Sequence, residues 1–106
     1  MLFAVFDGHG GKEVACYAKE RYPKCVAEKF GEFKVHGLGR VLSEAVVLLD
    51  SEIKQKEYGA DTGATACIVL VTETDIYCAN AGDSRGVLFT GNTVDPLSYD
   101  HKPQNE

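Results

Sequence analysis

The chain has 106 residues, of which 44% are hydrophobic and 25% are charged, an ordinary composition for a globular protein and a length that fits at most one domain. A formal net charge of −5 argues against an extended nucleic-acid surface, which needs clustered lysine and arginine. No apolar run approaches the length of a membrane span, and the start of the chain lacks a secretory signal. We therefore expect an intracellular protein, cytoplasmic or nuclear, with no nucleic-acid or membrane partner.

The first element expected is a short strand. An apolar run from Leu2 to Phe6 stops at the sequence DGHGG, residues 7 to 11, which predicts a buried strand ending in a tight turn that glycine permits. The polar residues of this turn lie where a strand ends. Such positions often carry functional side chains.

Two helices are expected next. Apolar residues at helical spacing predict a helix from Lys12 to Tyr22, with a boundary or kink at Pro23. A clearer period predicts an amphipathic helix from Leu38 to Ile53 that lies on a sheet. Residues 31–39 mix glycine with charge and are expected to connect the two.

The second half is predicted to be an antiparallel meander. The apolar runs 64–71 and 76–81 flank a polar turn and indicate a β-hairpin. The sequence GDSR, residues 82 to 85, then turns into a third strand from Gly86 to Phe89. A further turn leads to a strand from Thr93 to Leu97.

Four cysteines are separated by 9, 42 and 11 positions and form no CxxC pair of the kind that zinc and redox sites use. They are Cys16, Cys25, Cys67 and Cys78. We expect reduced, mostly buried thiols, because free cysteine packs as a small hydrophobic residue. A disulfide is the alternative.

Asp7 and His9 are the residues of the DGHGG segment that could carry chemistry. Asp7 is a carboxylate at a strand end, and the glycines after it let a metal ion or phosphate approach the backbone. His9 could act as a general acid, because an imidazole titrates near neutral pH. The structural alternatives are a plain turn for the segment and a surface histidine without a role.

Other enzyme classes lack their motifs. A His-Gly-Gly sequence is also typical of the oxyanion loop of lipases and esterases, but the GxSxG nucleophile elbow of those enzymes is absent. Neither GxGxxG nor GxxxxGK[ST] occurs, so nucleotide binding has no support.

Four strings in order extend over nearly the whole chain: LFAVFDGHGGKEVA at 2–15, GADTGATACIVLV at 59–71, YCANAGDSRGVLF at 77–89 and LSYDHKP at 97–103. Together they resemble type 2C, metal-dependent serine/threonine protein phosphatases. The resemblance implies an α+β fold, an αββα sandwich in which helices flank two antiparallel sheets. It also implies hydrolysis of phosphoserine and phosphothreonine in protein substrates.

The resemblance assigns roles to four residues around a centre of two Mg²⁺ or Mn²⁺ ions. Asp7 would bridge the ions and the carbonyl of Gly8 would also ligate metal. His9 would be the general acid, and Asp83 matches a position of a weaker third metal site. For Asp83, Ser84 and Arg85 a purely structural turn is the alternative, and the DHKP sequence at 100–103 is given no catalytic role.

The family pattern also places ligand segments before DGHGG and after the meander, and neither occurs here. Residues 1–106 are therefore expected to be part of a catalytic domain, inactive alone, with exposed sheet edges that favour self-association. One alternative is a short pseudophosphatase or interaction module. Another is a plain structural domain whose DGHGG and GDSR sequences are only turns.

Overall fold

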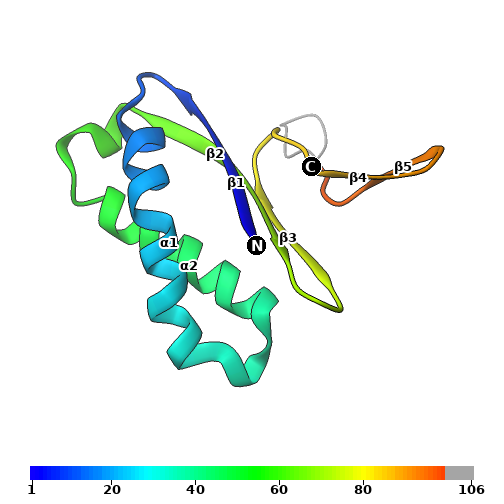
Figure 1. Cartoon of the computed structure of the whole chain (residues 1–106). Coiled ribbons are helices and arrows are strands. Elements are labelled where there is room, and N and C mark those ends of the chain that lie inside the picture. The colour runs from blue at the N-terminus through cyan, green and yellow to red at the C-terminus, as the bar shows by residue number, and fades with distance from the viewer. Residues whose placement is uncertain (100–106) are drawn as a thin grey trace. The chain divides into compact units, whose positions relative to one another are not determined.

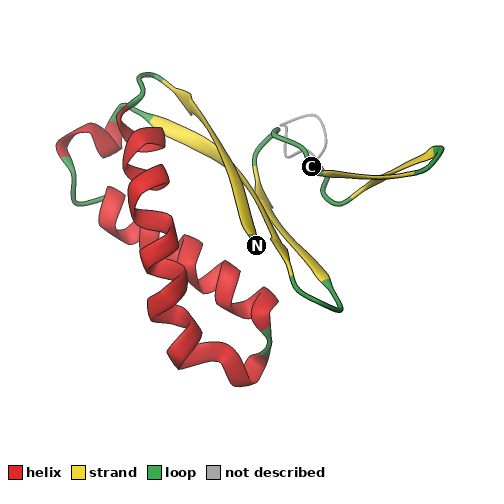
Figure 2. Cartoon of the chain, in the orientation of Figure 1, coloured by secondary structure: helices red, strands yellow, loops and turns green. Residues whose placement is uncertain are grey.

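The computed structural model of the chain describes residues 1–99, and this part contains two α-helices, two short 3₁₀ helices and five strands (Figures 1 and 2). In chain order they are β1 (Leu2–His9), α1 (Glu13–Phe33), η1 (Lys34–His36), α2 (Leu38–Ile53), η2 (Glu57–Ala60), β2 (Gly63–Val71), β3 (Ile76–Ala81), β4 (Val87–Thr90) and β5 (Thr93–Pro96). The predicted α+β class is confirmed. The DHKP sequence at 100–103 lies outside the described residues.

The chain divides into two compact units, which we describe separately. The first, called here the helical unit, is Phe6–Ala64. The second, called the strand unit, is Met1–Val5 together with the chain from Thr65 onward. Strands β1 and β2 each begin in one unit and end in the other.

In the helical unit, α1 and α2 form a hairpin joined through η1 (Figure 1). Each helix buries one stripe at helical spacing, and this packing stabilises both helices more than their intrinsic propensity does. The stripes are Val14, Ala18, Tyr22 and Cys25 on α1, and Val41, Leu42, Ala45 and Leu49 on α2. The predicted bounds of α2 are confirmed.

Tyr22 joins three elements of the helical unit. Its side chain is 1% exposed, and its hydroxyl donates a hydrogen bond to the carbonyl of Leu42, 3.1 Å away. Its ring meets Phe6 of β1 edge to face, with the ring centres 5.9 Å apart. Burial raises the pKa of the Tyr22 phenol, so the group stays protonated and continues to donate this bond.

Of the boundary or kink predicted at Pro23, the boundary is wrong, because α1 continues to Phe33 with Pro23 inside it. A proline removes one backbone hydrogen bond and crowds the preceding turn. Here Pro23 is exposed, while Tyr22 and Cys25 on either side continue the buried stripe. Packing against α2 therefore holds the helix together through the proline, and the connection between the helices is shorter than the 31–39 segment expected.

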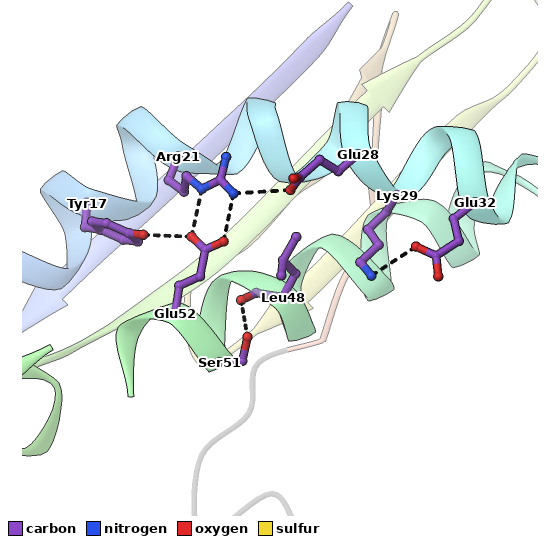
Figure 3. A network of polar contacts seen from close by, with 8 residues as sticks. All are labelled: Tyr17, Arg21, Glu28, Lys29, Glu32, Leu48, Ser51 and Glu52. Carbon is purple, nitrogen blue, oxygen red and sulfur yellow. Dashed lines mark hydrogen bonds and ion pairs between the residues drawn. The ribbon is translucent and has the colours of Figure 1, made fainter. Parts of the chain in front are cut away.

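A polar network also joins the two helices (Figure 3). Arg21 of α1 pairs with both carboxylate oxygens of Glu52 on α2, with its Nε and one terminal nitrogen each 2.8 Å from an oxygen. The Tyr17 hydroxyl donates to the same carboxylate at 2.7 Å, and Arg21 also reaches Glu28 at 3.2 Å. The hydrogen bonds from Arg21 and then Tyr17 lower the pKa of Glu52.

This lowered pKa makes the contribution of Glu52 to stability dependent on pH. The ionised carboxylate stabilises the folded chain above its ordinary pKa, and the contribution disappears as pH falls through the lowered value. We expect Glu52→Gln to lower the urea midpoint at pH 7, with a difference from the native chain that shrinks as pH falls from about 5 to 3. Glu20→Gln, an exposed change on α1, is the matched control and should differ little at any pH. A Glu52→Gln difference that is constant with pH would contradict the network's role.

In the strand unit, strands pair in the order β1-β2-β3. Met1 and Val71 exchange both backbone hydrogen bonds at 2.8 Å, the mark of an antiparallel pair. Strands β2 and β3 pair antiparallel from Ala66 opposite Ala81 to Val71 opposite Ile76, which confirms the predicted hairpin. Thr72 and Asp75 bond to each other across its turn, in part through the Thr72 hydroxyl.

The predicted continuous meander is wrong in one respect, because β4 and β5 form a separate two-stranded sheet and do not add to β3. The five residues 82–86 between β3 and β4 leave the strand direction, beginning at Gly82 with a φ of 109°. The Cβ of any other residue there would lie 2.5 Å from the Thr65 methyl group. Close contact between this segment and β2 therefore carries the chain away from the free edge of β3.

The expectation that β1 is buried is also corrected. Phe3 and Val5 are 53% and 60% exposed, whereas Leu2 and Phe6 are half-buried. Ala4, which shares the face of Leu2 and Phe6, is exposed as well, so this face of β1 is covered only in part. An apolar run alone does not distinguish a strand covered on one face from one covered on both.

All four cysteines are free, with Cys25 and Cys67 buried, Cys78 half-buried and Cys16 exposed. Of the thiols predicted to be mostly buried, the structure buries two of the four. Within residues 1–99, neither helix combines the length and apolar character needed to cross a membrane.

Candidate functional site

The glycine loop that the sequence singles out, residues 7–11, lies in the helical unit where β1 ends and α1 begins. Gly10 and Gly11 have φ angles of 73° and 147°. This left-handed region disfavours any residue with a Cβ. The loop therefore turns sharply just after His9, and Asp7, Gly8 and His9 occupy the last positions of the strand.

A second segment, residues 61–63, packs directly against this loop. A Cβ on Gly10 would collide with the backbone carbonyl of Asp61, and one on Gly11 would lie 2.8 Å from the Thr62 methyl group. A Cβ on Gly63 would lie 2.5 Å from Nε2 of His9. These glycines are needed for close approach, since no side chain fits between the two segments.

The second segment is itself fixed in place. The amide and hydroxyl of Thr62 both donate to the carbonyl of Tyr58 in η2, at 3.0 and 2.7 Å, and the Asp61 amide donates to the same carbonyl at 3.2 Å. The end of η2 therefore anchors residues 61–63. These residues in turn hold the imidazole of His9 against the backbone of Gly63.

The structure brings Asp7, Gly8 and His9 together on one exposed strand end. No hydrogen bond or ion pair within residues 1–99 occupies the Asp7 carboxylate or the His9 ring. The Gly8 backbone lies close to Gly11 and Ala15, whose nearest atoms would be 3.0 and 3.3 Å from a Cβ on Gly8. The Asp7 carboxylate and the His9 ring are thus exposed, on a backbone that α1 and residues 61–63 hold in place.

Asp83 lies in the strand unit, whereas Asp7 belongs to the helical unit. Its carboxylate is exposed in the segment between β3 and β4. The next residue, Ser84, shares a hydrogen bond of 2.7 Å with the Thr65 hydroxyl on β2. This hydrogen bond agrees with the structural alternative for GDSR, in which the segment only shapes a turn. A metal role for Asp83 stays a prediction.

One cluster of potential ligands was missed by sequence reasoning. Cys25, Glu28 and Glu52 place one ligand atom each within 4.8 Å of one another. The guanidinium of Arg21, however, pairs with both carboxylates, and a cation in this cluster would have to displace it. The cluster is therefore part of the bridge between the helices. Its signal in the sequence was hidden because the first helix was expected to end before Cys25.

The groups at the strand end fit a hard metal ion in kind. Carboxylate and carbonyl oxygens are the donors that Mg²⁺ and Mn²⁺ prefer. One carboxylate from Asp7 and one carbonyl from Gly8 are too few for an octahedral ion held by protein alone. No group of three His, Cys, Asp or Glu ligands that includes Asp7 is found in the described part of the chain.

A carboxylate, a backbone carbonyl and a histidine at one strand end are groups that a metal-dependent hydrolase can use. Comparison with known proteins agrees with this class. The family model of protein phosphatase 2C matches residues 1–106, so the chain belongs to the protein phosphatase 2C family.

Curated relatives from distant organisms resemble the chain over almost its whole length. A probable protein phosphatase 2C of Caenorhabditis elegans is 41% identical over 108 residues, covering 99% of this chain and 30% of the relative. Protein phosphatase 1L of Bos taurus is 38% identical, covering 96% of this chain and 31% of the relative. Protein phosphatase 2C 56 of Arabidopsis thaliana is 37% identical, covering 99% and 26%. The chain thus spans less than a third of the length of these relatives.

Proposed function

We propose that this chain is part of the catalytic domain of a metal-dependent phosphatase that hydrolyses phosphoserine and phosphothreonine in proteins. Membership of the protein phosphatase 2C family supports the reaction class. The observation that carries the assignment to particular residues is the close packing of the 7–11 loop on residues 61–63. It holds Asp7, Gly8 and His9 on one strand end.

In this proposal Asp7 and the carbonyl of Gly8 hold Mg²⁺ or Mn²⁺, with two ions in the complete centre and Asp83 at a weaker third site. Such ions supply charge neutralisation at the phosphoryl oxygens and make a water molecule more acidic. The chain's own contribution is to fix the two oxygen donors and to keep the imidazole of His9 next to them. His9 donates a proton to the departing serine or threonine oxygen.

We further propose that the chain is inactive alone. Two oxygen donors at the strand end do not complete a two-ion centre, and the chain spans less than a third of its relatives. Large apolar side chains also lie exposed, among them Phe3 at 53%, Val5 at 60% and Phe89 at 70%. These side chains favour self-association of the isolated chain.

The test is manganese-dependent release of phosphate from a phosphothreonine peptide, measured for this chain and for a longer protein that includes its flanking coding sequence. We expect no release from the chain. The longer protein should release phosphate, and either a chelator or Asp7→Ala should abolish the release.

Two results would contradict the proposal. Release by the chain alone that a chelator and Asp7→Ala both abolish would show that the chain completes a metal centre, for example by self-association. A folded longer protein that releases no phosphate would favour a pseudophosphatase or interaction module instead.

A further inference from the structure

Residues 57–63, called here the η2 connection, follow the end of α2 and lead to the candidate site, all within the helical unit. The last of them touches the imidazole of His9. A Cβ on Gly63 would lie 2.5 Å from Nε2 and 2.8 Å from Cε1, so the tip of the ring packs on the Gly63 backbone without room for a methyl group. Since no hydrogen bond within residues 1–99 orients this ring, packing contacts such as this one set its position.

Thr62 ties the η2 connection together. Its hydroxyl donates to the carbonyl of Tyr58 at 2.7 Å, and its amide donates to the same oxygen at 3.0 Å. Its methyl group meets the glycine loop, because a Cβ on Gly11 would lie 2.8 Å from it. The Thr62 side chain therefore links η2 to the loop that begins just after His9.

The other end of the η2 connection packs on α2. A Cβ on Gly59 would collide with the backbone carbonyl of Ile53, the last residue of α2. The amide of Gly59 donates to the carbonyl of Lys56 at 3.1 Å, and the amide of Lys56 donates to the carbonyl of Ile53 at 2.9 Å. Contacts therefore run from the end of α2 through η2 to His9.

The end of α2 from which these contacts start is firmly held. Leu49, one turn before it, is 5% exposed, and Glu52 pairs with Arg21 of α1 through two contacts of 2.8 Å. A proton donor works from a narrow range of positions, and a displacement of about 1 Å can lower a rate roughly 100-fold. Support from a packed helix hairpin keeps the ring of His9 within that range.

We propose that Thr62 and Gly59 are positioning residues for His9, because the η2 connection carries the fixed position of α2 to the imidazole. This inference rests on the proposed function, in which His9 gives its proton to the departing oxygen. Neither Thr62 nor Gly59 supplies a group to the reaction. Gly59 is the more informative of the two, since the three atoms nearest to a Cβ added there all belong to Ile53 and none to the glycine loop.

The first measurement needs no activity and uses the chain itself. Its nuclear Overhauser spectrum should show a cross-peak between the Hε1 proton of His9 and the α-protons of Gly63. Thr62→Val removes the hydroxyl but keeps a branched side chain of similar size, and Gly59→Ala forces η2 away from Ile53. Both changes should weaken or abolish the cross-peak.

Thr62→Ser and Ser51→Ala are the matched controls. Thr62→Ser keeps the hydroxyl and should retain the cross-peak. Ser51→Ala removes a hydroxyl that donates to the carbonyl of Leu48, also at 2.7 Å and in the same unit, but outside the η2 connection. This variant should retain the cross-peak as well.

The second measurement uses the longer, active protein with the same four variants. Thr62→Val and Gly59→Ala should lower kcat for a phosphothreonine peptide about 10- to 100-fold at a similar KM. They should change kcat for p-nitrophenyl phosphate little, because its leaving group needs no proton. A loss of folded protein would instead lower the rates of both substrates equally.

An unchanged cross-peak in both Thr62→Val and Gly59→Ala would overturn the proposal. So would equal slowing of the two substrates by folded variants, or no slowing of the peptide. A folded longer protein that releases no phosphate would remove the proposed function, and the cross-peak alone would then decide whether the η2 connection positions the ring.

Discussion

Replacing Leu42 by alanine should lower the free energy of unfolding by about 2–5 kcal/mol, the usual cost of a large-to-small change in a packed core. Leu42 is 1% exposed and lies on the buried stripe of α2. Its carbonyl accepts the Tyr22 hydroxyl, so the cavity would open beside the contact that joins the two helices. A domain of this size has a total stability of roughly 5–15 kcal/mol, so the loss is a large share of it.

Val47→Ala is the matched control, since Val47 lies on the same helix but is 63% exposed. Urea unfolding followed by helical circular dichroism should give a much lower midpoint for Leu42→Ala at a similar slope, and little change for Val47→Ala. Equal shifts for the two variants would mean that the stripe facing α1 does not form the core of the helical unit.

The elements that could be predicted from the sequence are those with a local, repeated pattern. The stripe of α2 and the two apolar runs of the β2–β3 hairpin each specify one structure over short distances along the chain. The pairing of β1 with β2 could not be predicted in this way. It joins Met1 to Val71, and nothing local in either strand selects its partner.

Pro23 shows a different limit. Local rules end a helix near proline, whereas tertiary packing of Tyr22 and Cys25 continues α1 to Phe33. The early end assigned to the helix also hid the bridge from Arg21 to Glu28, because their shared face is evident only on a continuous helix.

For the candidate site, the sequence identified the chemical groups but not what holds them. Asp7, Gly8 and His9 stand out because of their residue types and their position at a strand end. Residues 61–63 do not, although they contact the loop, because a glycine selected for close approach looks in sequence like any turn glycine. The hint available was the position of Gly63 directly before the apolar run 64–71.

A large and substrate-dependent effect on activity is expected for His9→Asn in the longer, active protein, and this prediction rests on the proposed function. Loss of a general acid typically lowers the rate about 10²- to 10⁴-fold. The loss should be large for a phosphothreonine peptide, whose alkoxide is a poor leaving group. It should be small for p-nitrophenyl phosphate, whose phenolate leaves without a proton.

Gly63→Ala should reproduce this selectivity without removing the imidazole. The added Cβ would lie 2.5 Å from Nε2 and 2.8 Å from Cε1 of His9, so the ring has to move. A ring at the end of a side chain can rotate away, so the chain is expected to fold. The turnover rate for the peptide should fall, while turnover of p-nitrophenyl phosphate should change little.

Gly31→Ala is the control for a glycine replaced in the same unit, since no atom lies within 4 Å of its added Cβ. It should leave the rates of both substrates unchanged. If His9→Asn slowed both substrates equally, the imidazole would not be the proton donor. If Gly63→Ala slowed both equally while His9→Asn did not, Gly63 would act on the fold of the loop. The proton donor is assigned to His9, and the positioning of its ring to Gly63, only if both variants slow the phosphothreonine peptide much more than p-nitrophenyl phosphate.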